Sequence, residues 1–301
     1  MQEKVYLCSV KRKERLIWLL KWLLLLAAYS YLAYRLAAYR DYPALWLQLR
    51  ATDAWGWGCL AGCLLLMPLN LLLEALKWRT LLAGICPLSV AEAQRQVYYG
   101  FVGAFVTPYR LGDYPARATR LPDPNRWKEA VAMGMYGSLV LTMTIVLTGW
   151  IPAFCFFAGE ASGNLHLMSV IVLAVGLPIC LLPLLKRWFP ALGTFFKANL
   201  WLVFLQSLAR YGVFCLQLYL VLRVFGVIIP LEEVWMAIPV YYLLVTLTPN
   251  MPAADAGIRG SWALLVFGRY TDCAPCIVFA VFALWIINTV IPLIVGTTQR
   301  G

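Results

Sequence analysis

Apolar residues form six long stretches along the chain, and polar residues fall mainly in the segments between them. These stretches are residues 16–38, 54–76, 130–151, 165–185, 199–222 and 274–296. A helix needs roughly 20 mostly apolar residues to cross the hydrocarbon core of a bilayer. The pattern therefore predicts six membrane-spanning helices. We expect the first to be retained, because its apolar run is too long for a signal peptide.

Two further apolar runs are interrupted by proline at about half the spanning length. Residues 97–107 precede Pro108, and residues 234–248 precede Pro249. Proline removes a backbone donor, and irregular backbone persists at membrane depth only when protein or a wet cavity surrounds it. We predict two re-entrant helical hairpins with the two prolines at facing tips. Their short second helices are expected at residues 113–121 and 255–268.

The two proline breaks have similar sequences. Both read Thr-Pro, a short linker and then Asp-x-x-x-Arg, with Asp113 and Arg117 in the first copy and Asp255 and Arg259 in the second. A spacing of four places acid and base on one helix face. Each break lies in the order two spans, hairpin, span, and an odd number of crossings inverts the second unit, as in many transporters. We predict an all-α integral membrane protein with an inverted repeat in one membrane domain, whose two units are residues 1–152 and 153–301.

Composition and charge support a membrane protein. Apolar residues make up 62% of the chain and charged residues 13%, against about 25% charged in soluble proteins. The net charge of +11 is expected to set orientation and attract anionic lipid headgroups. Nucleic acid is not an expected partner, because no soluble basic domain would bind it. With both termini in the cytoplasm, 17 basic residues lie inside and 6 outside, which favours that orientation.

Charged residues within apolar segments are the candidates for function. An ionised group at the centre of a membrane helix costs about 2.5 to 3.5 kcal/mol on insertion scales, so it is rarely left without a partner or a wet cavity. The start of each second half-helix favours an anion such as phosphate, and arginine adds fork-shaped donors. We expect Arg117, Arg210 and Arg259 to converge on one polar cavity. The predicted substrate-binding residues are Asn70, Glu74, Arg110, Asp113, Arg117, Arg210, Asp255 and Arg259.

The same residues also have purely structural interpretations. Asp113 and Asp255 would be helix N-caps whose salt bridges neutralise the hairpins internally. Glu74 would form a salt bridge at the cytoplasmic edge of its span, where Lys77 and Arg79 follow within about a turn and a half. Arg210 would extend its long stem towards a membrane interface, although it lies near the middle of residues 199–222.

Other catalytic chemistry finds little support in the sequence. His166 is the sole histidine, so no histidine-based metal cluster or catalytic triad can form. The sequence has no glycine-rich phosphate-binding loop with its lysine, and we expect neither a cofactor nor a metal. Cys273-Ala274-Pro275-Cys276 has the spacing of a thioredoxin-type motif, but it lies at the start of a helix without a surrounding βαβ pattern. The nine cysteines are interpreted as small apolar residues, with no disulfide framework.

Over nearly its whole length the chain resembles the transmembrane region of lysylphosphatidylglycerol synthases, a family of flippase-like membrane proteins. The residues that carry the resemblance are Asn70, Glu74, Trp78, Arg79, Gly100, Thr107 to Asp113, Arg117, Arg210 and Pro249 to Arg259. The second signature of that family is similar to Pro-Gly-Gly-x-Gly-x-x-Glu. This chain departs from it with Ala253-Ala254-Asp255 and Gly260, so Asp255 would take the place of the family's acid.

The resemblance implies a translocase in the bacterial inner (cytoplasmic) membrane. It would move an anionic or polyprenyl-phosphate-linked lipid between leaflets, with a separate glycosyltransferase or aminoacyl-lipid synthase as partner. We do not expect in this chain the soluble lysyl-transferase domain that the best-known members carry, and we expect a transporter rather than an enzyme. The alternative is a membrane-embedded transferase or accessory subunit acting on lipid-linked sugar, with Asp113, Asp255 or Glu74 as base. A third hypothesis is a scaffold without transport.

Overall fold

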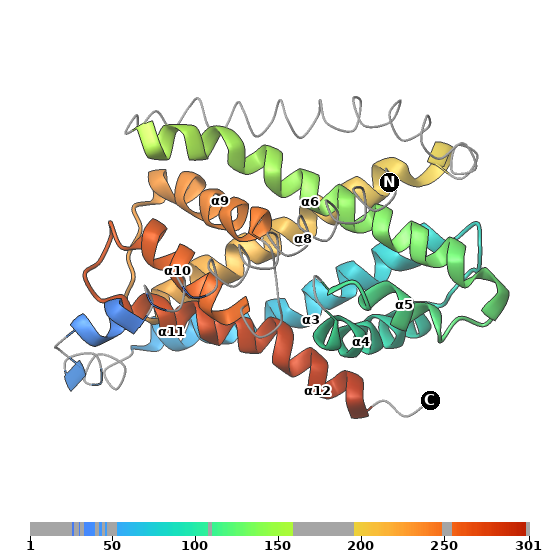
Figure 1. Ribbon diagram of the computed structural model, residues 1–301, viewed down its shortest axis with the longest axis horizontal. Coiled ribbons are helices and arrows are strands. Elements are labelled where there is room, and N and C mark those ends of the chain that lie inside the picture. The colour runs from blue at the N-terminus through green and yellow to red at the C-terminus, as the bar shows by residue number, and fades with distance from the viewer. Residues whose placement is uncertain are drawn as a thin grey trace, which may run out of the picture.

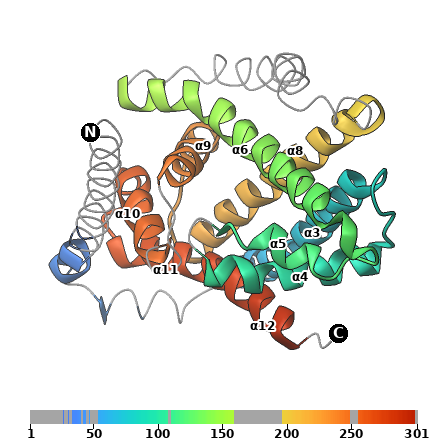
Figure 2. The same ribbon diagram turned by 45° about the vertical axis from the view of Figure 1, so that its right-hand side comes forward.

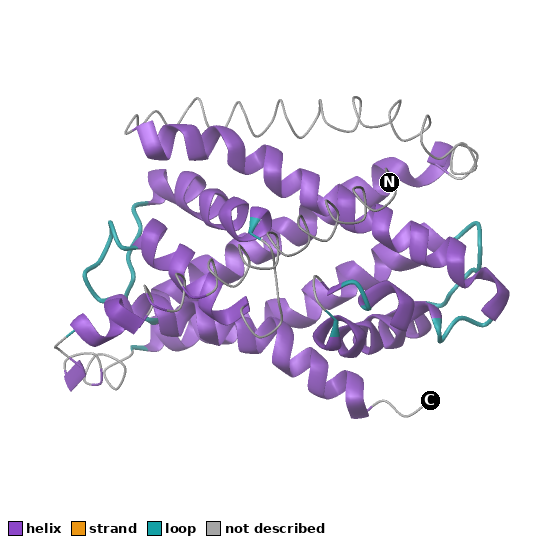
Figure 3. Cartoon of the chain, in the orientation of Figure 1, coloured by secondary structure: helices purple, strands orange, loops and turns teal. Residues whose placement is uncertain are grey.

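The computed structural model describes residues 53–107, 110–158, 196–248 and 255–298, with a few positions between 26 and 46. Within this part of the chain every regular element is a helix and none is a strand (Figure 3). The prediction of an all-α protein is therefore confirmed there. The elements are α3 (Ala54–Leu82), α4 (Val90–Val106), α5 (Asp113–Ala118), η2 (Pro124–Arg126), α6 (Trp127–Ala158), α8 (Phe196–Val224), α9 (Leu231–Leu247), α10 (Asp255–Phe267), α11 (Ala274–Trp285), η4 (Ile286–Val290) and α12 (Ile291–Thr298).

Four helical segments are long and apolar enough to cross a membrane. They are Ala54–Leu82, Pro124–Phe157, Trp201–Val224 and Ala274–Thr298. Each contains most or all of one span predicted from the sequence. The other two predicted spans, 16–38 and 165–185, lie largely or wholly outside the described residues. The described part of the chain thus has the helices of an integral membrane protein.

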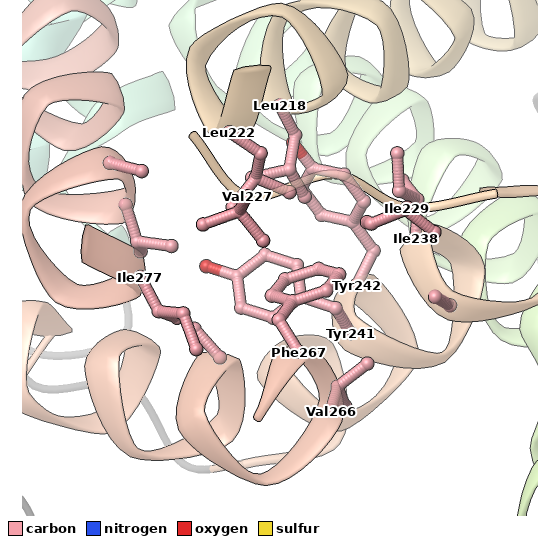
Figure 4. Packing of buried hydrophobic residues seen from close by; sticks show 14 of the residues in the cluster. Leu218, Leu222, Val227, Ile229, Ile238, Tyr241, Tyr242, Val266, Phe267 and Ile277 are labelled. Atoms are coloured by element: carbon pink, nitrogen blue, oxygen red, sulfur yellow. The ribbon is translucent and has the colours of Figure 1, made fainter. Parts of the chain in front are cut away.

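The helices pack around two apolar clusters. In Figures 1 and 2, α6 lies on one side of the molecule and α11 and α12 on the opposite side, with α8 and α9 between them. One cluster joins α8, α9, α10 and α11, where Leu218 and Leu222 pack near Tyr241, Phe267 and Ile277 (Figure 4). The other joins α3, α4 and α6, with members that include Leu71, Leu82, Val97 and Met133. Burial of these side chains stabilises the bundle through dispersion and close packing.

Helices α4 and α5 form the first helix pair. Ser89 begins α4 with a capping box, in which its hydroxyl and backbone N–H donate to Glu92 and lower the pKa of that carboxyl. At the other end, the Thr107 hydroxyl donates to the Gly103 carbonyl (2.8 Å) and accepts the Gly112 N–H (2.7 Å). The threonine that precedes the proline break therefore ties α4 to the turn that leads into α5.

Helices α9 and α10 form the second helix pair, and its threonine makes a similar contact. The Thr248 hydroxyl donates to the Leu244 carbonyl (2.7 Å) and accepts from the Trp262 indole N–H (2.8 Å). The second helices begin at Asp113 and Asp255, as the sequence predicts. The two prolines expected at the hairpin tips, Pro108 and Pro249, lie outside the described residues.

Two cysteines form a disulfide at the start of α11, between Cys273 and Cys276. This pair differs from the expectation that the cysteines serve as small apolar residues. The other described cysteines agree with that expectation, because they carry free thiols, four of which are buried. They are Cys59, Cys63, Cys86, Cys155 and Cys215.

Glycine allows α4 and α5 to approach closely. A Cβ atom built on Gly103 would lie 2.2 Å from the carbonyl oxygen of Gly112, and one on Gly100 would lie 2.2 Å from Asp113 Oδ1. Neither distance is tolerated by real atoms, and the Gly112 carbonyl belongs to the backbone, which moves little. Gly100 and Gly103 therefore allow the two helices to pack closely.

We predict that Gly103→Ala destabilises the protein while Gly212→Ala does not. The new methyl at position 103 clashes with backbone, and overpacking of this kind costs about 1–3 kcal/mol. Gly212, also within a helix, has open space where a Cβ would lie, with no atom within 4 Å, so alanine there brings only its higher helix propensity. Thermal unfolding in detergent measures the difference. Equal melting temperatures for the two variants would show that α4 and α5 are not closely packed.

Candidate functional site

A cavity of about 250 Å³ lies between the two apolar clusters. Members of both clusters line it, including Leu71 and Phe101 from one and Tyr241 and Leu284 from the other. Seven of the eight residues predicted to bind substrate also line it, and they are Asn70, Glu74, Arg110, Asp113, Arg117, Arg210 and Arg259. The eighth, Asp255, contacts Arg259 directly. The structure therefore brings together side chains from segments far apart in the sequence.

Glu74 lies at the centre of the polar contacts. Its side chain is buried, with the residue 1% exposed. Oε1 accepts from Arg117 at 2.8 Å, and Oε2 accepts from Lys77 at 2.8 Å and from Arg210. A buried carboxylate is costly without partners, and these three cations offset that cost. The ion pair with Lys77 exists, but it lies in the interior rather than at an exposed edge of the helix.

Arg117 donates hydrogen bonds to two carboxylates, those of Asp113 and Glu74. Its Nε and NH2 donate to the two Asp113 oxygens at 2.7 and 3.0 Å, while NH1 donates to Glu74. Its side chain is 2% exposed. This geometry matches the salt bridge of the structural interpretation, because the guanidinium is already paired with carboxylate oxygens. The expectation that Asp113 is the N-cap is wrong, since Gly112 holds that position and no side chain caps α5.

Arg210 links α8 to two positions on α3. Its Nε donates to Asn70 Oδ1 at 2.8 Å and its NH1 donates to Glu74. Asn70 and Glu74 are four residues apart, so they present their acceptors on the same helix face. The Arg210 guanidinium thus points into the cavity and makes its contacts there, rather than extending to an end of α8.

Arg259 repeats the pairing of Arg117 but is more accessible. Its Nε donates to Asp255 Oδ1 at 2.7 Å, the same atoms and distance as in the first pair. The other Asp255 oxygen accepts from the Trp285 indole N–H at 2.9 Å. The Arg259 side chain is 24% exposed. The two Asp–Arg pairs are thus alike in bonding and unlike in access.

Arg110 combines a strained backbone with an unneutralised side chain. Its φ of 57° lies in the left-handed region, which residues other than glycine rarely adopt. Its guanidinium lies 5.3 Å from the centre of the Phe101 ring, and among the described residues no carboxylate forms an ion pair with it. Such strain persists only where the surroundings enforce it, and it clusters at functional sites.

Several lining residues were not among those predicted to bind substrate. Lys77 is 1% exposed and contacts Glu74, and its spacing of three from Glu74 was a signal for it. Tyr114 and Phe214 place their rings 4.9 and 5.2 Å from the guanidinium carbons of Arg117 and Arg210. Nothing in an apolar, aromatic-rich sequence distinguishes these two rings from the rest.

A second chain of polar contacts reaches the cavity through α8 and η4. Gln217 donates to the Cys63 carbonyl at 3.1 Å, and its Oε1 accepts from Asn288 at 3.0 Å. Asn288 lines the cavity from η4, which is a π-helical turn. Turns of this kind are often found at functional sites because they redirect side chains. No pattern in the sequence indicates this turn.

The cavity carries an excess of two positive charges. Lys77, Arg110, Arg117, Arg210 and Arg259 are basic, whereas Glu74, Asp113 and Asp255 are acidic. This positive charge comes from side chains rather than from the dipole of α5. That helix has only six residues, and its first residue is an aspartate. Within the described chain, no group of three His, Cys, Asp or Glu side chains is placed to bind a metal ion. The site is suited to an anion that accepts hydrogen bonds.

No family model matches this chain, and neither a curated protein nor a solved structure matches it. The resemblance to the lysylphosphatidylglycerol synthase family stays a hypothesis. The function is therefore argued from the cavity itself.

We predict that Glu74→Gln strongly destabilises the protein, whereas Glu232→Gln does not. The first change leaves three buried cations facing a neutral amide, and breaking a buried ion pair costs about 3–5 kcal/mol. Glu232 is exposed in the first turn of α9. The melting temperature in detergent should fall by an amount on the order of 10 °C for Glu74→Gln. Similar temperatures for both variants would mean that Glu74 does not organise the cavity.

Proposed function

We propose that this protein is a membrane lipid translocase whose cavity binds an anionic, phosphate-bearing headgroup. The observation that carries the proposal is the cavity's positive excess, with Arg110 lacking a carboxylate partner among the described residues and Arg259 partly exposed. Uncompensated charge inside a protein is unfavourable, so an anionic ligand would stabilise this arrangement. The lipid tails would stay in the bilayer while the headgroup passes through the cavity.

The arginines favour phosphate over other anions. Guanidinium groups present planar, fork-shaped donors that match phosphate and carboxylate oxygens. Arg110 and Arg259 are the donors open to a ligand, whereas Arg210 is oriented by Asn70 and Glu74 at the cavity wall. Arg117 would act as the internal counter-ion. An anionic phospholipid or a polyprenyl-phosphate-linked lipid satisfies this chemistry.

Two re-entrant hairpins in an inverted repeat would place this site at membrane depth. The support is local: both second helices begin at the aspartate of an Asp–Arg pair, and both threonines donate to a carbonyl four residues earlier. Interrupted helices around a midplane site are typical of transporters with such repeats. The hairpins would expose irregular backbone only to protein and to the cavity.

The proposed orientation places both termini in the cytoplasm of a bacterial inner membrane. It rests on the distribution of basic residues. This orientation assigns residues 269–273 to the outside, and Cys273 of the Cys273–Cys276 disulfide is the last of them. Disulfides persist in oxidising compartments, so the pair agrees with the assignment. A separate glycosyltransferase or aminoacyl-lipid synthase would supply the lipid.

A transferase acting on lipid-linked sugar is less well supported. It would need Glu74, Asp113 or Asp255 as a general base, and each of these carboxylates accepts from at least one arginine. Both oxygens of Asp255 are engaged, one by Arg259 and one by Trp285. A base must be free to accept a proton from its substrate.

We predict that Arg110→Lys and Arg259→Lys slow lipid exchange while Arg95→Lys does not. Lysine keeps the positive charge but lacks the planar pair of donors that a guanidinium offers to phosphate. A hydrogen bond to a charged group is worth about 1.5–3 kcal/mol, so losing one should slow lipid exchange about tenfold or more. Arg95 is exposed on α4 and serves as the matched control. Vesicles carrying fluorescent phosphatidylglycerol or fluorescent polyprenyl phosphate measure exchange by external quenching. Full exchange of both lipids by folded Arg110→Ala and Arg259→Ala proteins would contradict the proposed site.

We predict that Asp123→Cys and Asp272→Cys are labelled from opposite sides of the membrane. Asp272 is exposed before α11, and the Asp123 side chain is 48% exposed before α6. In a background without other cysteines, a membrane-impermeant maleimide should reach position 272 from outside intact cells. It should reach position 123 only in inverted vesicles. Labelling of both positions from the same side would refute the inverted repeat.

A further inference from the structure

The Cys273–Cys276 disulfide lies outside the cavity, where α11 begins. We propose that this pair is a thiol–disulfide exchange site, which reacts with the dithiol of a partner protein at the membrane surface. The proposal is independent of lipid translocation. It rests on the placement of the two sulfur atoms, the local helix geometry and the short loop that the bridge closes.

The two cysteines differ in exposure. Cys276 is 2% exposed and belongs to the apolar cluster that includes Ile277, whereas Cys273 is half-buried and packs against the edge of that cluster. A thiolate from another protein can therefore approach Cys273 but not Cys276. Ala274–Thr298 is a candidate membrane span, so Cys273 lies immediately before its first residue. This position is where a soluble dithiol domain would meet the protein.

The start of α11 favours a thiolate at Cys273. Cys273 is the N-cap residue, and its sulfur accepts the backbone N–H of Cys276 at 3.3 Å. The helix has 12 residues, so the positive end of its dipole adds to this hydrogen bond. Pro275 lies in the first turn of α11. Proline has no backbone N–H, and this costs nothing there because N–H groups in the first turn have no acceptor within the helix. The reduced pair would thus have its reactive sulfur on the accessible residue.

A purely structural role explains the bridge poorly. A disulfide stabilises mainly by restricting the unfolded chain, and this effect grows with the length of the closed loop. Here only two residues separate the cysteines, so the restriction is small. The other described cysteines carry free thiols, including the buried Cys63 and Cys155. Within the described chain, pairing is therefore confined to Cys273 and Cys276.

The exchange proceeds in two balanced steps. A thiolate of the partner dithiol attacks Sγ of Cys273, the Cys273–Cys276 bond breaks, and Cys276 leaves as a thiolate that takes up a proton. The partner's second thiol, on losing its proton, attacks the partner sulfur of the mixed disulfide and releases Cys273. The disulfide of this chain gains two electrons and two protons, and the partner dithiol is oxidised to a disulfide.

Single cysteine variants of the full chain in detergent test the proposal. Glutathione disulfide is the probe, and peptide mass spectrometry locates the adduct. Cys276→Ser leaves the accessible thiol and should form a mixed disulfide at Cys273. Cys273→Ser leaves the buried thiol and should react at Cys276 at least about tenfold more slowly. Cys215→Ser, which changes a free thiol on α8, should keep the native bridge and form no adduct at position 273 or 276.

Wild-type protein provides a second measurement that needs no substitution. Dithiothreitol should reduce the Cys273–Cys276 bridge while the protein stays folded, as judged by gel filtration and an unchanged melting curve. Two results would overturn the proposal. One is a bridge that is reduced only when the protein unfolds, and the other is equal reaction at the remaining cysteine in the two folded single variants.

Discussion

The Glu74 carboxylate is the contact on which the polar interior depends. It is 1% exposed and accepts from Lys77, Arg117 and Arg210, so one buried anion joins α3, α5 and α8. Removing water from four ionised groups is tolerated only when their geometry satisfies them together. The short helix α5 makes this clear, because its six residues provide little apolar surface of their own. Its position follows from Arg117, which contacts Glu74 and Asp113 at once, and from the glycines of α4 that let it approach.

This arrangement gives the two Asp–Arg pairs different roles. Both have a spacing of four and an Nε to Oδ1 distance of 2.7 Å. The first lies against Glu74, which accepts from NH1 of Arg117, and the Arg117 side chain is 2% exposed. The second lies against Trp285, which donates to Asp255 and leaves the Arg259 side chain 24% exposed. The two Asp–Arg pairs therefore have the same sequence spacing but different exposure. The residues around each pair make Asp113–Arg117 buried and Asp255–Arg259 partly accessible.

Features that depend on the spacing of residues and on the length of apolar segments could be predicted from the sequence. Four described helices match predicted spans, both short helices begin at the expected aspartates, and the charged residues of apolar segments meet at one cavity. Tertiary contacts determine the rest. The left-handed backbone of Arg110, the π-helical turn that carries Asn288 and the rings beside the arginines have no local signature. For Cys273 and Cys276 the spacing was visible, but the absence of a βαβ unit argued against a redox pair. The start of α11 supplies the same N-terminal helix geometry without that unit.

The energetics of the arginines decide where an anion would enter the ion-pair network. Arg117 makes three charge-assisted hydrogen bonds to two carboxylates, and each such bond is worth about 1.5–3 kcal/mol. A phosphate would have to replace all three while Glu74 stayed buried beside two other cations. Arg259 has one carboxylate contact, and Asp255 would keep its Trp285 hydrogen bond if the arginine turned away. Arg110 has no carboxylate contact to lose within the described residues. Under the proposed function, a headgroup would bind Arg110 without displacing a carboxylate, exchange with Asp255 at Arg259, and leave the Glu74 network intact.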